Sequence, residues 1–296
     1  LLAGGYIFLR ALRLGRPASI LGAVMWTFSS YFLILIAAGH IWKLMTLCFI
    51  PPTLAGILYI YRGQYLKGAA LTALFASLQI LSNHVQMSYY FGFLILFLLI
   101  AFLVEAVRTG QLRRFVLSTL VLLGSGLIAI GINSSNLYHT YEYGAETIRG
   151  GSELTPLAGQ GAQAKEATAS GLDKDYITAW SYGKGETLTL LVPNAYGGAT
   201  GALAEDADAM GHIPSEYQQI LGQLNHYWGD QPFTAGPVYV GAFVLFLFLL
   251  GCFVVEGPIK WALVGGTIFS IALAWGHNMM WLTDLFIDYV PLYNKF

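Results

Sequence analysis

Charged residues are scarce in this chain of 296 residues: only 10% are Asp, Glu, Lys or Arg. An average water-soluble protein carries roughly a quarter. Hydrophobic residues make up 56% of the chain, and the mean hydropathy is +0.61. The formal net charge is −1, so we expect no nucleic-acid partner. This composition excludes an ordinary soluble fold and predicts an all-α polytopic membrane protein.

Cysteine is also rare. Cys48 and Cys252 both fall in predicted spans near opposite ends of the bilayer, so neither a disulfide nor a cysteine-ligated metal site is expected. The chain has no HExxH, no pair of CxxC motifs, no Walker loop and no dinucleotide-type glycine run. No cofactor is therefore certain. A divalent metal held by His84, His139 and nearby carboxylates stays open, although no spacing requires it.

Apolar runs of about the length that crosses ~30 Å of hydrocarbon recur along the chain. They cover residues 1–12 (truncated), 18–38, 42–61, 68–82, 87–104, 115–132, 238–255 and 259–275. A further segment, 279–290, is shorter and contains Asp284 and Asp288. We expect that segment to be interfacial or re-entrant.

The loops between these runs alternate in charge. One set holds nine of the 15 basic residues and only two acids, Glu105 and Glu256. The other set covers 39–43, 83–86, 133–237 and everything after 275; it holds six basic residues, 14 acids and all six histidines. By the positive-inside rule the first set is cytoplasmic and the second exterior, or periplasmic where an outer membrane exists. We call these ends the basic end and the histidine end.

Three domains follow from this pattern. A membrane domain of about six spans covers 1–132, an exterior or periplasmic loop domain covers 133–237, and two further spans with the short segment cover 238–296. Within the loop domain we expect a helix over 136–149, a mobile lid over 155–175, a strand or short helix over 187–193, and a helix from Pro214 to Trp228.

Two turns at the histidine end offer ligands for an anionic group such as a phosphate. His40 and Lys43 lie three residues apart and can face the same way. The span before His84 has 15 residues, or roughly 22 Å of helix, so Asn83 and His84 should be recessed below the surface. The structural alternative is that Trp42 and Lys43 only anchor a helix end and that the second turn only joins helices.

Other polar residues at this end would suit a sugar or an acceptor, through stacking and hydrogen bonds. The candidates are Asn83, Gln86, Tyr138, Glu142, Asn194 and Tyr196, with Arg149 in reserve for the phosphate. Glu142, Glu146 and Arg149 are also spaced as ordinary helix pairs. Similar aromatic and polar clusters occur at 225–230 and 275–278, and each is a weak signal alone.

Six motifs taken in order are recognisable as a set. They are an arginine-bearing loop at 9–16, Gly39-His40, Asn-His-x-Gln followed by tyrosines at 83–90, Leu-Val-Pro-Asn-x-Tyr-Gly at 191–197, Tyr-Trp-Gly at 227–229 and Pro-Leu-Tyr-Asn-Lys-Phe at 291–296. This set resembles the YfhO family of bacterial membrane proteins, which is grouped with the C-type (GT-C) glycosyltransferases. The resemblance covers essentially the whole chain.

The resemblance implies a GT-C-like helical bundle in the bacterial inner membrane, with its active face exterior or periplasmic. Its substrate would be a polyprenyl-phosphate-linked sugar, and membrane lipids would surround it. GT-C enzymes usually carry the catalytic acid in the first exterior loop, which we expect upstream of Leu1, so no catalytic residue is assigned here.

Two other functions remain open. The chain could be a non-catalytic subunit of a larger membrane assembly that keeps the scaffold. It could also be a lipid or solute transporter, because Pro51 and Pro52 interrupt a span and discontinuous helices line transport sites. A proline-kinked helix explains the same pair of residues.

Overall fold

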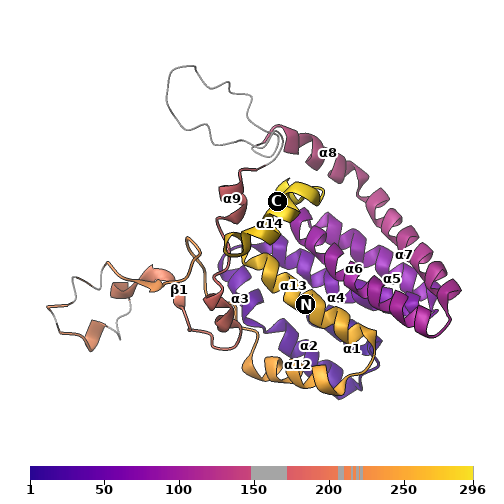
Figure 1. Cartoon of the computed structure of the whole chain (residues 1–296), viewed down its shortest axis with the longest axis horizontal. Coiled ribbons are helices and arrows are strands. Elements are labelled where there is room, and N and C mark those ends of the chain that lie inside the picture. Colours follow the sequence, from indigo (N-terminus) through magenta and orange to yellow (C-terminus); the bar gives the residue numbers. More distant parts are fainter. Residues whose placement is uncertain (148–171, 206–209, 215, 218–219, 221–222, 296) are drawn as a thin grey trace.

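The computed structural model is mostly helical and describes residues 1–147, 172–205, 210–214, 216–217, 220 and 223–295 (Figure 1). The α-helices are α1 (Leu2–Ala11), α2 (Arg16–Thr27), α3 (Ser30–Ala37), α4 (Ile41–Tyr61), α5 (Tyr65–Leu81), α6 (Val85–Arg108), α7 (Leu112–Ile132), α8 (Ser134–Ala145), α9 (Lys174–Thr178), α12 (Ala242–Val254), α13 (Pro258–Ala274) and α14 (Met280–Tyr289). The strands are β1 (Gly197–Ala202) and β2 (Asn225–Tyr227), and the 3₁₀ helices are η1 (Gly185–Leu190), η2 (Leu203–Glu205), η3 (Gly276–Met279) and η4 (Tyr293–Lys295).

The protein is a membrane protein with several candidate spans. Within the described residues, four segments are long and apolar enough to cross a bilayer: Arg16–Ala37, α4, α6 and α7. A fifth is the pair formed by α13 and the Gly276–Tyr289 segment, which bends by 113° at the break. α5 and α12 are apolar but shorter. All eight predicted runs are helical, although fewer than eight helices reach full spanning length.

The predicted span at 18–38 is not one continuous helix. The chain leaves helical geometry after Thr27, and Ser29 is extended before α3 begins. A contact between distant parts of the chain lies beside the break. The Ser30 hydroxyl donates to the Tyr239 carbonyl oxygen at 2.7 Å and accepts from the Tyr239 amide at 3.0 Å. The run of apolar residues carries no sign of this bond.

α4 is the central helix of the membrane domain and packs against α1, α5 and α7. More than half of its most apolar stretch of 18 residues is buried. α4 and α5 cross at two glycines. A Cβ added to Gly68 would lie 2.6 Å from the Ile60 amide nitrogen, and one added to Gly56 would lie 2.7 Å from that of Thr72. Small residues let membrane helices approach this closely. α4 runs unbroken through Pro51 and Pro52, so the predicted interruption there is absent.

The loop domain differs in part from its prediction. α8 follows directly from α7 and confirms the helix expected there, while the predicted lid lies almost wholly outside the described residues. The segment expected as a strand or short helix begins inside η1. The helix predicted to reach Trp228 is wrong at its end, because Asn225–Tyr227 is β2 and pairs antiparallel with β1. The Asn225 carboxamide oxygen accepts from the Gly201 and Tyr227 amides, which stabilises this arrangement.

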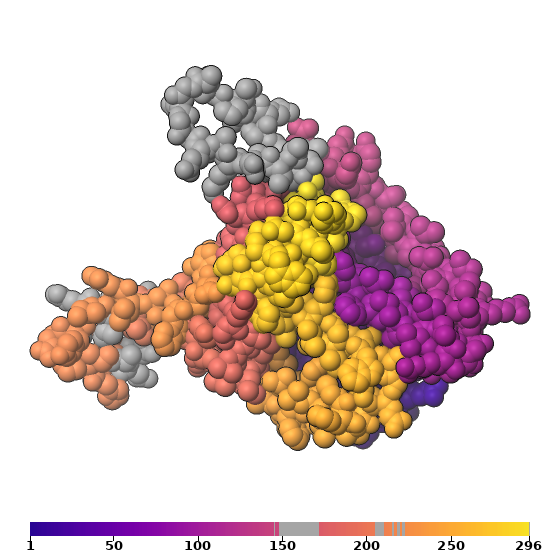
Figure 2. Space-filling model, in the orientation of Figure 1, coloured from indigo at the N-terminus to yellow at the C-terminus, as the bar shows by residue number. Residues whose placement is uncertain are grey.

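The C-terminal segment joins the loop domain to the membrane helices (Figure 2). The Tyr182 amide donates to the Ala274 carbonyl at 2.7 Å, and the Trp275 indole donates to Thr187 at 2.9 Å. Asp284 and Asp288, which interrupt the predicted short segment, lie 2.6 and 3.9 Å from the Lys174 ammonium group. These polar links support α14 at the end of the helix bundle.

Candidate functional site

Both histidine-bearing turns begin a long helix. Gly39 has φ +73° and Asn83 has φ +54°, a left-handed conformation that reverses the chain directly before His40 and His84. The two histidines are then the residues that precede the first turns of α4 and α6. The turn geometry therefore sets both rings at the same end of the bundle.

His84 is half-buried, and its Nδ1 atom is buried with no hydrogen-bond partner among the described residues. Burial lowers the pKa of His84 below its usual range, and the charges of Lys43 and then His40 lower it further. These charge effects act between the two turns at the histidine end that carry His40, Lys43 and His84. Among the described residues, no hydrogen bond or ion pair joins the three side chains. Burial therefore favours the uncharged form of the His84 ring.

Lys43 is the fixed positive charge of this group. Its ammonium nitrogen lies 5.6 Å from the centre of the Tyr31 ring, within reach of a cation–π contact. His40 is exposed. A positive charge, a neutral imidazole and an exposed imidazole can together accept a phosphate through charge and N–H donors.

Asn83 links this group to α8. Its carboxamide oxygen lies 3.5 Å from the Asn136 amide nitrogen and 3.4 Å from the Thr140 hydroxyl. Gln86 is half-buried in the first turn of α6. Tyr138 is exposed on α8. Glu142 is also exposed, and its carboxylate lies 3.7 Å from the His139 ring.

The remaining sugar-side candidates lie elsewhere. Asn194 and Tyr196 directly precede β1, which Figure 1 shows well away from α8. Asn194 is exposed, whereas Tyr196 lines a small cavity of about 40 Å³ together with Tyr227. Arg149 lies outside the described residues.

A buried carboxylate in the same small cavity has no counterpart among the predicted site residues. Glu186 is only 2% exposed and accepts hydrogen bonds from the Gly183 amide, the Asp230 amide and the Tyr227 hydroxyl. Burial and the bond to Glu186 raise the pKa of Tyr227 above its usual range. The Asn278 amide donates to the Asp230 carboxylate at 3.1 Å, so the weak clusters at 225–230 and 275–278 do meet. No linear pattern marks Glu186, because its partners come from other segments.

No family model, curated protein or solved structure matches this chain. Over the described ranges, no three His, Cys, Asp or Glu side chains are grouped so that they could hold a metal ion. The chemistry of the histidine end therefore has to be judged from its own geometry.

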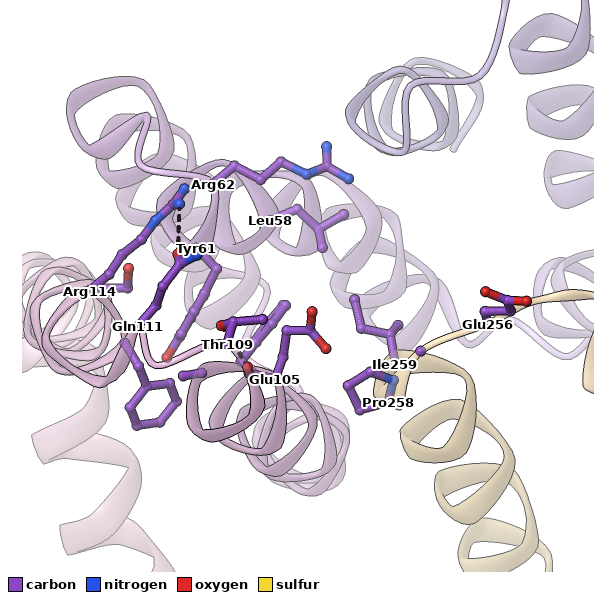
Figure 3. Close-up of a pocket in the computed structure, with 15 residues that line it drawn as sticks. Leu58, Tyr61, Arg62, Glu105, Thr109, Gln111, Arg114, Glu256, Pro258 and Ile259 are labelled. Atoms are coloured by element: carbon purple, nitrogen blue, oxygen red, sulfur yellow. Dashed lines mark hydrogen bonds between the residues drawn. The ribbon is translucent and has the colours of Figure 1, made fainter.

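A cavity of about 440 Å³ lies at the basic end. Figure 3 shows it between the ends of α4, α6 and α7 and the segment that leads into α13. Sequence reasoning placed all site candidates at the other end and missed this cavity. The only signal was the pair of acids in otherwise basic loops.

Proposed function

We propose that this protein is a membrane glycosyltransferase that moves a sugar from a polyprenyl-phosphate carrier to an acceptor at the non-cytoplasmic face of a bacterial inner membrane. The observation that carries the proposal is the buried Nδ1 atom of His84, which has no hydrogen-bond partner among the described residues, at the end of the bundle where the turn with His40 and Lys43 also lies. The motif resemblance to the YfhO family supports the same class of reaction.

In this reaction the acceptor hydroxyl oxygen attacks the anomeric carbon. The bond between that carbon and the carrier phosphate oxygen breaks, the phosphate keeps the electron pair, and the hydroxyl proton passes to a base. We assign this base to no residue of the chain. Lys43 and His40 offer positive or donor groups to the leaving phosphate, and the neutral His84 ring offers an N–H. Donors preorganised in a half-buried site stabilise developing charge more strongly than water does.

The sugar would lie beside the phosphate on the side of α8. Asn83 and Gln86 flank His84 in the same turn, and Tyr138 and Glu142 are exposed on the helix that Asn83 contacts. Asn194 and Tyr196 lie near β1 instead, so the proposal gives them no contact with the transferred sugar and reserves them for the acceptor.

Binding of the carrier tests the phosphate group independently of the sugar. The full chain in detergent would be titrated with polyprenyl phosphate and the complex counted by native mass spectrometry. We expect Lys43→Ala and His84→Ala each to weaken binding about tenfold or more, because a hydrogen bond to a charged group contributes ~1.5–3 kcal/mol. Exposed residues at the same end provide the matched controls, Lys184→Ala and His212→Ala. Equal binding by all four variants would refute the phosphate assignment.

Transfer from a labelled lipid-linked sugar then separates an enzyme from a non-catalytic subunit. An enzyme transfers label, and loses transfer in His84→Ala. A subunit that keeps only the scaffold binds the carrier without turnover. A transporter has less support, because α4 is continuous at the prolines that suggested one.

A further inference from the structure

The cavity at the basic end contains charges of both signs. Arg62 and Arg114 line it, and so do Glu105 and Glu256. The two glutamates are the only acids in the loops predicted to be cytoplasmic, and the fold brings both to one cavity from distant parts of the chain. Such a coincidence is unexpected if the acids only interrupt a basic surface.

These charges do not neutralise one another. Among the described residues, no ion pair within 4.0 Å involves either arginine or either glutamate. Arg62 donates to the Ala11 carbonyl, and Arg114 donates to the Gln111 carboxamide oxygen at 3.2 Å (Figure 3). Each guanidinium is thus held by neutral partners and has further N–H donors to offer.

Much of the cavity wall between these charges is apolar, formed by Leu58, Phe102, Ala106, Phe115, Pro258 and Ile259. Thr109, Gln111 and Ser118 add polar groups to it. Tyr61 stacks on Phe102 with ring centres 4.1 Å apart, which fixes one wall. The cavity lies where α4 and α6 end and α7 begins, and the ends of spanning helices are expected near the headgroups of a bilayer. Its volume falls within the ~300–1,000 Å³ typical of small-molecule sites.

We propose that this cavity binds a zwitterionic aminophospholipid of the phosphatidylethanolamine type from the cytoplasmic leaflet. Its phosphate would bind Arg114 and Arg62, because guanidinium groups match phosphate oxygens. The primary ammonium would donate hydrogen bonds to Glu105 and Glu256, and the acyl chains would follow the apolar wall. A wholly anionic lipid would meet two uncompensated carboxylates, and a choline headgroup has no N–H to donate to them.

The test measures lipid affinity of the full chain in detergent by native mass spectrometry, with short-chain phosphatidylethanolamine, phosphatidylcholine and phosphatidylglycerol. We expect phosphatidylethanolamine to bind about tenfold more tightly than the other two, a difference of ~1.4 kcal/mol. Glycerophosphoethanolamine, which has the headgroup but no acyl chains, should bind far more weakly. If it binds as tightly as the lipid, the ligand is a soluble zwitterion and the lipid proposal is wrong.

Variants separate the two halves of the headgroup. The double change Glu105→Gln and Glu256→Gln should remove the preference for ethanolamine over choline, whereas Glu216→Gln, an exposed acid of the loop domain, should keep it. Arg114→Gln should weaken all three phospholipids about tenfold. Arg113→Gln changes a neighbouring exposed arginine that does not line the cavity, and should leave binding unchanged. Equal affinity for all three lipids, or an unchanged preference in the double variant, would overturn the proposal.

Discussion

The two ends of this molecule are stabilised by different interactions. At the basic end, the helices contact one another through a close crossing at glycines and through stacked aromatic rings. The charged side chains there form no ion pairs with each other among the described residues. At the histidine end, charged groups are built into the fold: Glu186 accepts three hydrogen bonds and Lys174 pairs with two aspartates. Charged groups that form no ion pair within the fold remain available to bind ligands. By that criterion we propose Lys43, with the neutral His84 ring on the neighbouring turn, and the four charged residues of the cavity at the basic end as binding groups.

The largest effect is expected where α4 and α5 cross. Gly68→Leu places a side chain where even a Cβ would lie 2.6 Å from the Ile60 amide nitrogen, so the helices must separate. We expect little folded protein, measured as the monodisperse fraction after detergent extraction. Gly124→Leu on α7 is the control, since nothing lies within 4 Å of its Cβ position. Equal recovery of the two variants would mean that close crossing does not hold this end.

A smaller loss is expected at the histidine end from Glu186→Ala. The change leaves the Gly183 and Asp230 amides and the Tyr227 hydroxyl without their acceptor. Buried groups left unbonded cost about 1–3 kcal/mol each before relaxation, so the melting temperature should fall clearly. Glu105→Gln at the basic end should shift it little, because no hydrogen bond of that carboxylate is recorded among the described residues. Similar melting temperatures for the two variants would remove the contrast between the ends.

The ion pairs of Lys174 should contribute less. Lys174→Ala removes contacts of 2.6 Å to Asp284 and 3.9 Å to Asp288, but the side chains of Lys174 and Asp284 are each 39% exposed. Partly exposed pairs contribute roughly 0–1 kcal/mol and are screened by salt. We expect a small drop in melting temperature that shrinks at high salt, and no drop for Lys184→Ala. A large loss that is independent of salt would show that packing, not charge, dominates here.

The smallest expected effect is a pH dependence from His84. Its pKa is lowered in the folded protein, so the unfolded chain takes up the proton first as pH falls. Stability should therefore be fully present above the ordinary histidine pKa of about 6.5 and decline below it. Melting temperatures from about pH 8 to about pH 5 should fall less in His84→Gln than in the parent protein. A bound phosphate should oppose the decline, and parallel curves would show that His84 is not the responsible group.

Local patterns were enough to predict much of the helix arrangement. The apolar runs around Ile41–Tyr61 and Val85–Arg108 exceed what a soluble helix tolerates, so each indicates a helix by itself. The helix after Asn133 was also predictable, because it continues the preceding span. The break before Ser30 was not, since the local run is apolar and the hydrogen bond of Ser30 beside the break goes to Tyr239, far along the chain. β2 was missed for the same reason: its partner strand lies beyond a long loop, and the local periodicity favoured a helix.

The candidate site residues also differ in whether the sequence alone could identify them. His40 and Lys43 were identified from their spacing in a polar turn, and His84 from the short span before it. The burial of the His84 Nδ1 atom without a hydrogen-bond partner among the described residues is a property of the packed turns. Glu186 carries no local signal, since burial alone distinguishes it from an exposed acid. The cavity at the basic end likewise exists only once α4, α6 and α7 meet the segment before α13.

The sequence by itself determined that this chain enters a membrane, roughly where its helices run and which end carries the basic residues, because transfer into hydrocarbon acts on each segment separately. The tertiary structure alone decided which polar groups form hydrogen bonds or ion pairs with other parts of the chain and which do not. That distinction depends on partners that are distant in sequence, such as Glu186 with Tyr227, and on glutamates that share a cavity without pairing.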